Sequence, residues 1–324
     1  MTATYNVNEV PFNEWVKDHM DCSEIAICGH MDDKSIASFD IITSLVGKTI
    51  DVSELTFSFL GENYKAPLDI QEYINWVVEE MDCFRPRVIL VLIAGKERFS
   101  RYFVAKDGVL SEDRKTLVFL KDPYVSLDIP TGIEHIGDYA CQGEWASDRE
   151  LPTRHLVIPE GVVSIGKLSF ADLDITSVTL PSTLRALGEM SFESTELKSV
   201  EIPEGVEEIP PFCFLYTPIS HIQFPHSLRV IHERAFSLDS YDDELIIPEG
   251  VEEISWDALD YIRRISFPST LKKLAKDFYY EDVVDNGENK PYIRVHEDNP
   301  CFYSRNGKIY QRQHTIEYIP DKKE

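Results

Sequence analysis

The side chains best able to bind a metal or to catalyse a reaction lie near the N-terminus, in the run Cys28-Gly-His-Met-Asp-Asp33 and at Cys22 before it. Thiolate, imidazole and carboxylate groups are the ligands that zinc takes in proteins, and the same groups serve as nucleophiles and general bases. The spacing of two cysteines and a histidine here matches no common zinc pattern. We therefore predict a loop of solvated charges, and we expect no metal ion, no cofactor and no catalytic residue in the chain.

The net charge of the chain indicates which kinds of partner it can bind. The chain has 324 residues with 57 acidic and 32 basic side chains, a formal net charge of −25. Phosphates would be repelled over most of such a surface, so we expect no nucleic acid as partner, whereas a basic protein would be attracted. The longest apolar run, from Val88 to Gly95, is too short to cross a bilayer, so no membrane insertion is expected.

The six cysteines are far apart in the sequence, at Cys22, Cys28, Cys83, Cys141, Cys213 and Cys301. Such spacing is typical of free thiols in a reducing compartment rather than of a disulfide framework. The first residues lack a basic start followed by an apolar stretch, which is the mark of a secretory signal. A cytoplasmic location is therefore predicted, with a cell-surface location as the alternative if a leader has been removed.

A short phrase recurs along the chain: an apolar residue, any residue, a second apolar residue and then proline. Its prolines are Pro130, Pro159, Pro181, Pro203, Pro225, Pro248 and Pro268. An apolar pair follows each proline, and in the middle coils a small residue and a phenylalanine come next, as in Ser191-Phe192. The alternation places two apolar side chains on one face of a short strand, which the proline ends. One such coil cannot bury this face alone, so the repeats must stack into a solenoid.

These residues resemble a known repeat. The segment Ile158-Pro-Glu-Gly-Val-Val-Ser-Ile-Gly-Lys-Leu-Ser-Phe170 reproduces most of the pattern of the BspA-like leucine-rich repeat, and the likeness covers roughly residues 103–320. The resemblance implies a solenoid of mostly short strands and turns. Members of this family are often bacterial surface or secreted proteins that bind other proteins, so the resemblance also implies a protein partner.

The coils are of two kinds. Coils that begin with Pro-Glu-Gly-Val alternate with coils that begin with Pro-Ser-Thr-Leu or Pro-His-Ser-Leu, so the true unit is a doublet. The sign of the exposed charges alternates in step along the second strand, through Arg185, Glu207-Glu208, Arg229, Glu252-Glu253 and Lys272-Lys273. Like charges on neighbouring rungs repel, so we expect this ladder of charges to fix the order of the coils.

A second internal match frames the array. The segment from Phe103 to Leu117 aligns without gaps on the segment from Phe302 to Ile316. Each contains Asp-Gly or Asn-Gly between alternating segments, which predicts a hairpin with a two-residue turn. We expect the two hairpins, within residues 99–120 and 293–320, to cover the open ends of the coil stack.

Residues 1–98 contain no repeat and are expected to form a small α/β domain, followed by the solenoid over residues 99–324. Apolar periodicity predicts helices over residues 11–20 and 69–82. Strands are expected over 23–28, 48–59 and 87–93. No family resemblance is found for this domain.

The candidate binding residues lie at exposed positions of the first strand of each coil and in the loops inserted between coils, where repeat proteins usually carry specificity. They are Trp145, His155, Thr179, Ser199, Glu201, His221, Gln223, Tyr241, Glu244 and Arg264. These positions offer no convergent nucleophile and base, so a non-enzymatic protein–protein interaction module is the favoured function. A surface adhesin and an enzyme with its site in residues 1–98 are the alternatives, and the oligomeric state is left open.

Overall fold

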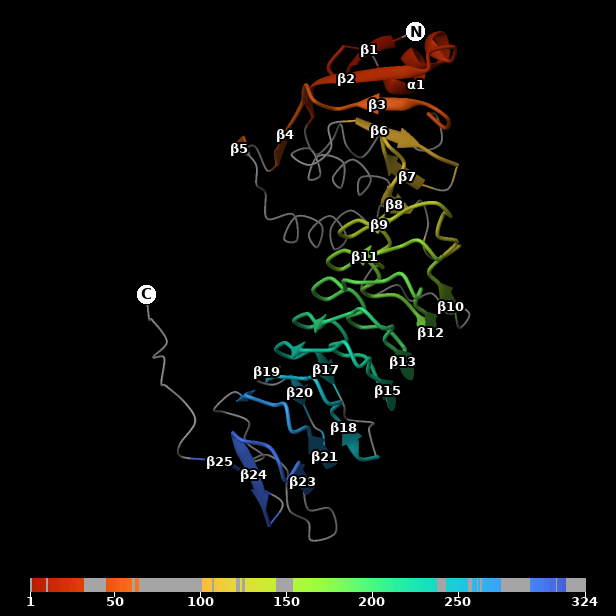
Figure 1. Ribbon diagram of the computed structural model, residues 1–324. Coiled ribbons are helices and arrows are strands. Elements are labelled where there is room, and N and C mark those ends of the chain that lie inside the picture. The colour runs from red at the N-terminus through yellow and green to blue at the C-terminus, as the bar shows by residue number, and fades with distance from the viewer. Residues whose placement is uncertain are drawn as a thin grey trace. The chain divides into compact units, whose positions relative to one another are not determined.

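Figure 1 shows the computed structural model of the chain, which divides into two compact units, Met1–Leu151 and Pro152–Glu324. The described residues are 2–9, 11–31, 45–59, 62–63, 101–106, 108–120, 123, 126–143, 154–237, 243–255, 258–260, 262, 264–274, 292–306 and 308–312. The predicted helix over 69–82, the predicted strand over 87–93, Trp145 and Tyr241 lie outside them. The predicted domain boundary near residue 98 stays a prediction.

The first unit is built on a mixed sheet. Its elements are β1 (Thr2–Asn6), α1 (Phe12–Trp15), the 3-10 helix η1 (Val16–His19), β2 (Glu24–Met31), β3 (Thr49–Asp51), β4 (Leu55–Phe59), β5 (Glu62–Asn63), β6 (Arg101–Val104), β7 (Gly108–Ser111), β8 (Thr116–Leu120) and β9 (His135–Ile136). The strand order is β9-β8-β7-β6-β3-β2-β4-β5, and β1 pairs with β2. Strands β1 and β3 both run parallel to β2, whereas β6 runs antiparallel to β3.

The sequence suggested a loop at Cys28, but the structure places Cys28–Met31 in a strand, while Asp32 and Asp33 lie outside the described residues. Strand β2 continues through Cys28 and His30 to Met31. The side chain of Asn8 fixes this extension, because its Nδ2 donates to the carbonyl of His30 over 2.7 Å and its Oδ1 accepts from the His30 N–H over 2.8 Å. On the side of β2 where β1 ends, a side-chain amide thus makes the two hydrogen bonds that a neighbouring strand would make. The expected helix over 11–20 and the expected strand over 23–28 are both present, as α1 with η1 and as β2.

The predicted strand over 48–59 is two strands, β3 and β4, which pair with different parts of β2. Lys48, just before β3, is only 7% exposed. Its Nζ donates to the carbonyls of Met20 and Cys22, each over 2.5 Å, so the ammonium group satisfies two carbonyls that follow η1. A cation at the end of a helix also meets the negative end of the helix dipole.

The segment 99–120, expected as a hairpin at the open end of the coil stack, forms three strands, of which β8 pairs in parallel with β9 of the first coil. Strand β6 pairs with β3 along one edge, and β7 pairs with β8 along the other, so both edges of the hairpin are used within the first unit. Gly108 also lies in strand β7 rather than in the turn that its Asp-Gly dipeptide predicted. Glycine is required there because a Cβ on Gly108 would lie 2.2 Å from the carbonyl oxygen of Phe119 in β8.

The first repeat phrase, residues 127–130, forms no strand. The hydroxyl of Ser126 accepts from the N–H of Asp128 and donates to the Asp128 carboxylate, a local turn that competes with strand pairing. Ile129 still turns inward and is 8% exposed. The phrase therefore keeps its apolar contact to the core without its hydrogen-bonded ladder.

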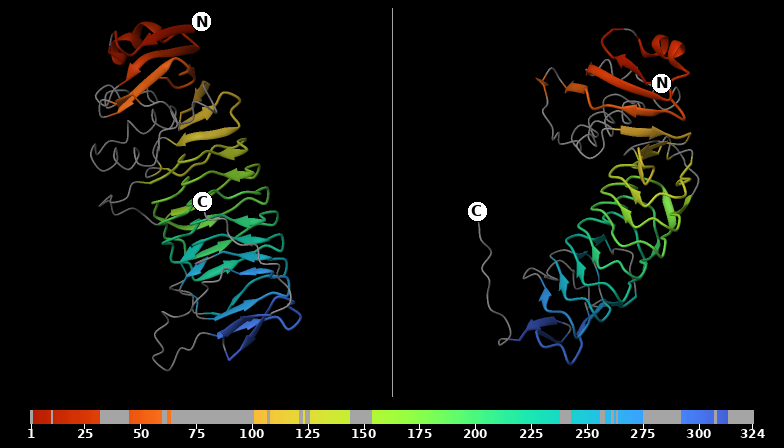
Figure 2. Two further views of the ribbon diagram at one scale, coloured as in Figure 1. Left: turned by 90° about the vertical axis from the view of Figure 1, so that its left-hand side faces the viewer. Right: turned by 45° about the horizontal axis from the view of Figure 1, so that its top comes forward.

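The second unit is a solenoid of parallel strands that follow one another from coil to coil (Figure 2). The first strand of each coil is β10 (Arg154–Val157), β12 (Ile175–Thr179), β13 (Ser199–Glu201), β15 (His221–Gln223), β18 (Leu245–Ile246), β21 (Arg264–Phe267) or β23 (Tyr292–Val295). The second strands are β11 (Ser164–Ile165), β14 (Glu208–Ile209), β16 (Val230–Ile231), β19 (Glu253–Ile254) and β22 (Lys273–Leu274). Short third strands β17 (Phe236–Ser237) and β20 (Leu259–Asp260) and a hairpin of β24 (Phe302–Arg305) with β25 (Lys308–Gln311) complete it.

A column of phenylalanines fills the centre of the coils. Phe170, Phe192, Phe214 and Phe236 are each 0% exposed. Their ring centroids lie 5.3, 5.5 and 5.2 Å apart in succession, with the rings close to parallel. Offset stacking at this separation is favourable beyond the area that the rings bury. The predicted small-aromatic pair of each middle coil is confirmed as the repeating core unit.

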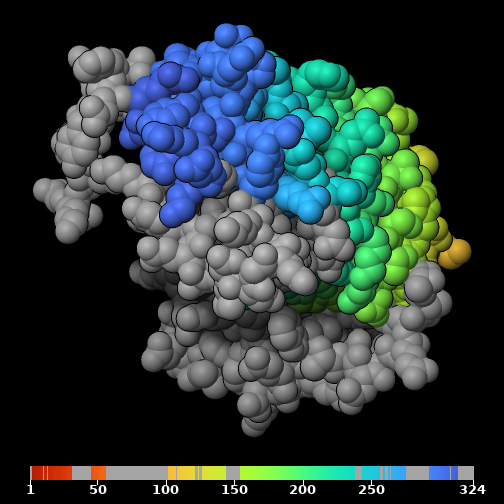
Figure 3. Space-filling view, turned by 90° about the horizontal axis from the view of Figure 1, so that it is seen from below, coloured from red at the N-terminus to blue at the C-terminus, as the bar shows by residue number. Residues whose placement is uncertain are grey.

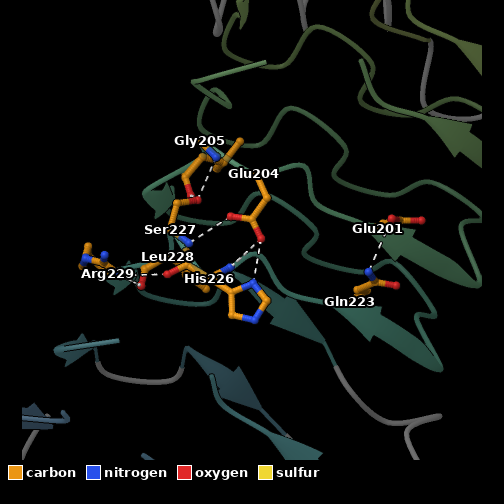
Figure 4. A network of polar contacts seen from close by, with 9 residues as sticks. Glu201, Glu204, Gly205, Gln223, His226, Ser227, Leu228 and Arg229 are labelled. Carbon is orange, nitrogen blue, oxygen red and sulfur yellow. Dashed lines mark hydrogen bonds and ion pairs between the residues drawn. The ribbon is translucent and has the colours of Figure 1, made fainter. Parts of the chain in front are cut away.

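The doublet has a structural cause in the turns after the prolines (Figure 4). The carboxylate of Glu204 accepts the N–H groups of His226 and Ser227 in the next coil, over 3.0 and 3.3 Å. The N–H of Gly205 donates to the hydroxyl of Ser227 over 2.8 Å, and that hydroxyl donates to the carbonyl of Val206 over 2.8 Å. Each Glu-Gly coil is thereby clamped to the coil that follows it.

The same clamp recurs at both other Glu-Gly coils. The carboxylate of Glu160 accepts the Ser182 N–H over 2.9 Å, and Glu249 accepts the Ser269 N–H over 2.9 Å. The threonines that follow, Thr183 and Thr270, receive the glycine N–H groups. The identity of the turn residues, which the sequence showed only as an alternation, is therefore explained by hydrogen bonds between successive coils.

The ladder of alternating charges forms in part. Lys272 and Lys273 pair with Glu252 and Glu253 over 2.8 and 2.5 Å, as predicted. The two arginines differ from the prediction, because the Nη1 group of each bonds to carbonyls of its own turn, Arg185 to Ser182 and Leu184, Arg229 to His226 and Leu228. A guanidinium presents several donors in a rigid plane, which suits a cluster of carbonyls better than an ammonium does.

These arginines link each doublet to the next. A Cβ on Gly205 would lie 2.8 Å from the Arg185 guanidinium carbon, and a Cβ on Gly250 would lie 2.3 Å from Nη1 of Arg229. Both glycines have a positive φ, of 99° and 109°. Glycine is therefore required twice at this position, by the backbone conformation and by the arginine that packs against it.

The glutamate clamps predict a specific acid sensitivity. Hydrogen bonds from the next coil lower the pKa of Glu160 and of Glu204, and the pKa of Glu249 is lowered by its bonds to Ser269 despite partial burial. Their stabilisation is complete above the pKa of an unfolded glutamate, about 4.3, and is lost as the pH falls through the lower folded values. Replacing all three by glutamine should reduce the fall in melting temperature between neutral pH and about pH 3.

Thermal unfolding followed by circular dichroism at both pH values would measure this difference. The matched control is Glu207→Gln, whose carboxylate accepts no hydrogen bond from the residues that the structure describes. An equal acid-induced fall in the triple variant and in this control would show that the clamps do not contribute.

The second hairpin is joined to the last coil by one buried amide. Asn299 is 1% exposed, and its Nδ2 donates to the carbonyls of Pro268 and Leu271 over 2.8 and 3.0 Å. Its Oδ1 accepts the N–H groups of Cys301 and Phe302, both over 2.8 Å. Every hydrogen-bonding position of this side chain is therefore used.

Candidate functional site

The first strands of the coils present outward-facing side chains along three ladders, β10 with β12, β13 with β15, and β18 with β21 and β23, of which the first two can be followed in Figure 1. The central apolar side chain is buried in every one of these strands except β12, where Val178 is half-buried, and the residues on either side of it point outward, as a strand requires. Within each ladder the parallel register aligns these outward residues in two columns. We call this the first-strand face; its members are His155, Val157, Ser177, Thr179, Ser199, Glu201, His221, Gln223, Glu244, Ile246, Arg264, Ser266, Tyr292 and Arg294.

The N-terminal part of the first-strand face carries hydroxyl and imidazole groups together with an exposed valine. The imidazole of His155 lies between two hydroxyls, with Nδ1 2.7 Å from the Ser177 Oγ and Nε2 3.1 Å from the Thr179 Oγ1. Val157, beside His155 on the same strand, is 53% exposed. Among the described residues, two hydroxyls rather than a carboxylate hold the imidazole of His155.

The exposed side chains in the middle of the face make few hydrogen bonds with one another among the described residues. Ser199 pairs with His221 and Glu201 with Gln223 in the parallel register. The Gln223 amide donates to the Glu201 carboxylate over 3.4 Å, a long contact that both exposed side chains can give up to a partner (Figure 4). These four predicted residues therefore do lie together on one surface.

The C-terminal part of the face carries the side chains best suited to anchoring a partner. Ile246 is 68% exposed and Tyr292 is 42% exposed. The Arg294 side chain lies over the Tyr292 ring at 4.9 Å and donates to its hydroxyl over 2.7 Å, and this bond raises the pKa of the guanidinium. Tyrosine and arginine are enriched among the residues that dominate binding energy at protein interfaces.

Glu244 and Arg264, both predicted as binding residues, belong to this C-terminal part. The Glu244 carboxylate accepts from the Ser266 hydroxyl over 2.5 Å. Arg264 lies opposite Tyr292 in the register and makes no ion pair with any residue that the structure describes. The sequence analysis missed Tyr292 and Arg294, because the proline phrase is absent after β23. The alternation of Ile293 and Val295 was the signal that could have found them.

A perturbed carboxyl lies away from this face, in the turn after Phe192. Burial raises the pKa of Glu193 to about 7, and the nearby charges of Asp172 and Glu189 add to the effect. Among the described residues, no three His, Cys, Asp or Glu side chains gather so that they could hold a metal ion. Within the same residues, no helix has the length and apolar character needed to span a bilayer.

The central part of the sequence matches a known repeat family. The family model described as BspA type leucine rich repeat region, in 6 copies, matches residues 116–239 and 148–266. A solved leucine-rich repeat protein from Bacteroides ovatus is 19% identical, with 52% of this chain and 54% of that one covered and a TM-score of 0.31. A leucine rich cell surface protein from Faecalibacterium prausnitzii is 18% identical, with 66% and 59% covered and a TM-score of 0.40. This chain therefore spans little more than half of those two proteins, and no curated protein matches it.

Proposed function

Residues 116–266 are a BspA-type leucine-rich repeat region, and on that basis we propose that the solenoid is a non-enzymatic protein-binding module whose first-strand face holds the partner. The observation that carries the proposal is the exposure of Ile246 and Tyr292 on this face, at 68% and 42%. Large apolar and aromatic side chains that remain open to water on a regular surface are the usual anchors of a protein interface.

The rigidity of the face supports the same proposal. Its side chains project from strands that are paired on parallel ladders, so little backbone freedom is lost when a partner binds. The part of the face at His155 and the anchoring part at Tyr292 lie on the first strands of different coils, so a partner that contacts both would span several coils. The acidic chain as a whole, with a net charge of −25, favours a basic partner.

Site-specific photo-crosslinking in cells of the source organism tests this proposal on the full chain. A photoreactive residue at position 246 should capture a protein, and the same residue at Val230 should not. Val230 is the matched control, because it lies in a second strand, β16, between Glu208 and Glu253. The pair of changes Ile246→Lys and Tyr292→Ser should then weaken the captured complex by more than about tenfold.

Equal capture from both positions, or an affinity unchanged by the paired substitution, would show that the first-strand face is not the binding surface.

A cytoplasmic location remains part of the proposal and rests on the cysteines, of which Cys22, Cys28, Cys141, Cys213 and Cys301 are free thiols. Labelling of intact cells with a membrane-impermeant maleimide tests it. If the cysteines of this chain react with the reagent before the cells are lysed, the protein lies on the cell surface instead.

A further inference from the structure

The last three first strands form one ladder of the first-strand face, and its register is known residue by residue. Strands β18, β21 and β23 run parallel (Figure 1), with Ile246 opposite Ser266 and Ser266 opposite Arg294. Arg264 lies opposite Tyr292 in the neighbouring column. Figure 3 shows atoms of these last coils, in cyan and blue, at the surface of the molecule. The outward side chains of this ladder therefore lie in two adjacent columns.

The positive charge of the first-strand face is concentrated on this ladder. The members of the face on β10, β12, β13 and β15 include neither arginine nor lysine. On the last ladder, Arg264 and Arg294 accompany a single acidic residue, Glu244, whose carboxylate accepts from the Ser266 hydroxyl over 2.5 Å. Neither arginine forms an ion pair with a residue that the structure describes. The ladder thus carries two cations and one anion in a chain whose net charge is −25.

The two arginines are placed so that both can contact one carboxylate. Arg264 and Arg294 are diagonal neighbours across β21 and β23, a separation of about 7–8 Å that long side chains span. The Arg294 guanidinium lies 4.9 Å from the Tyr292 ring centre, and its Nε donates to the Tyr292 hydroxyl over 2.7 Å. This bond orients the guanidinium and uses one of its five N–H donors. A carboxylate matches the remaining donors, because arginine binds it through two parallel hydrogen bonds.

An exposed apolar side chain lies beside the arginines. Ile246 is 68% exposed and is a diagonal neighbour of Arg264, two rungs from Arg294 in its own column. Neighbouring rungs are about 4.8 Å apart, and alternate residues of an extended chain are about 6.6 Å apart. An extended segment that lies along the columns therefore reaches Ile246 with one side chain and the two arginines with the side chain two positions away.

The sign of the charge that this ladder stabilises is a local property. At physiological ionic strength the interaction between exposed charges is screened over about 8 Å. The acidic side chains in the rest of the chain influence the approach of a partner, whereas Arg264 and Arg294 determine which charge is stabilised at the contact itself.

We propose that this ladder binds an extended segment of the partner protein in which an acidic residue lies two positions from a large apolar residue. The carboxylate binds between Arg264 and Arg294, and the apolar side chain covers Ile246. Tyr292 holds the guanidinium of Arg294 in position. This inference rests on the proposed function of the first-strand face and adds the chemistry of the segment that is bound. That segment is acidic, although the chain as a whole attracts a basic partner.

The test selects peptides from a display library of random dodecapeptides on the full chain. Peptides with an aspartate or glutamate two positions from leucine, isoleucine, valine or phenylalanine should be enriched more than about tenfold over the unselected library. The change Arg264→Glu with Arg294→Glu should abolish this enrichment and favour a basic residue in place of the acidic one. The matched control, Lys106→Glu with Lys198→Glu, makes the same change of net charge at exposed positions outside the ladder and should still select the acidic pattern.

A neutral variant separates binding from folding. Arg264→Gln with Arg294→Gln should weaken the best selected peptide by more than about tenfold in fluorescence anisotropy. The same variant should not further weaken a peptide whose acid is replaced by its amide, because both changes remove one contact. Its melting temperature should change little. A clear fall in melting temperature would assign the arginines to contacts within the chain and overturn the proposal.

Other outcomes also count against the acidic segment. Enrichment of basic peptides, no enrichment at all, or an acidic pattern that survives Arg264→Glu with Arg294→Glu would each overturn the proposal. Displacement of the selected peptide by anionic vesicles or by an oligonucleotide at lower concentration would overturn it in favour of a membrane or a nucleic acid. Failure of the proposed function is distinguishable, because it is seen as absence of capture at position 246. Capture there without the acidic pattern would refute only the chemistry of the segment.

Discussion

Replacing Phe192 by alanine is expected to lower the free energy of unfolding by about 3–5 kcal/mol. The side chain is 0% exposed, and its ring lies between those of Phe170 and Phe214 at 5.3 and 5.5 Å. The substitution removes the aromatic contact on both sides and leaves a cavity that the stacked coils cannot close, because their spacing is set by backbone hydrogen bonds. Urea unfolding followed by circular dichroism measures the loss.

The position of Phe192 within the array adds a second expectation. Each coil of a solenoid contacts its immediate neighbours, so a weakened coil in the middle separates the stability of the two halves. We expect the unfolding transition of the variant to broaden or to divide in two. Phe192→Leu is the matched control, since it keeps most of the apolar volume and should cost less than half as much. A loss for the alanine variant under about 1 kcal/mol would contradict the central role of the phenylalanine column.

The substitution Asn299→Asp should release the C-terminal hairpin from the last coil. It keeps the oxygen that accepts from Cys301 and Phe302, but it replaces the donor to Pro268 and Leu271 by a second oxygen facing their carbonyls. Loss of the two bonds leaves buried carbonyls without a donor, and the cost is about 2–5 kcal/mol. Because the loss is local, hydrogen exchange should rise in residues 292–312 and change little in residues 154–237.

Asn299→Ser separates the two parts of this effect, because the shorter side chain removes the donor without adding a charge. It should produce the same local increase in exchange with a smaller loss of stability. Unchanged exchange at Phe302 in both variants would mean that the contact of the hairpin with the coils, and not the amide of Asn299, holds it in place.

The repeat made much of the second unit predictable. A spacing of one coil predicted that His155 lies beside Ser177 and Ser199 beside His221, and the parallel registers confirm both pairs. The phenylalanine column followed from the same spacing. In a solenoid every strand has its partner in the next repeat, so the sequence of one coil states both the local structure and the contact that it makes.

Prediction failed where the partner of a residue is not set by the repeat. The pairing of β6 with β3 joins residues about fifty positions apart in sequence and belongs to no periodic pattern, so the strand on the other side of the first hairpin could not be predicted. Gly108 was placed in a turn because the approach of Phe119 could not be seen from the dipeptide alone. Arg229 was assigned to a ladder of charges, since the carbonyls of its own turn do not appear as charges in a sequence.

The candidate site was predictable in position and less so in composition. The residues from His155 to Gln223 lie where the strand alternation placed them, whereas Tyr292 and Arg294 follow an insertion that breaks the spacing of the prolines. A prediction based on a fixed spacing of prolines fails after such an insertion, although the strand that follows the insertion still pairs with the preceding coil.

The clamp at Glu204 also bears on how this gene can change in length. A Glu-Gly coil bonds to the coil that follows it, and the arginine of that second coil packs against the next glycine, so neighbouring coils are never equivalent. Loss or gain of a single coil would set two coils of one kind against each other, and two adjacent Glu-Gly coils would leave the glycine N–H without the hydroxyl that accepts it. Recombination within the array should therefore be tolerated in even steps, and related genes should differ by two coils or four rather than by one.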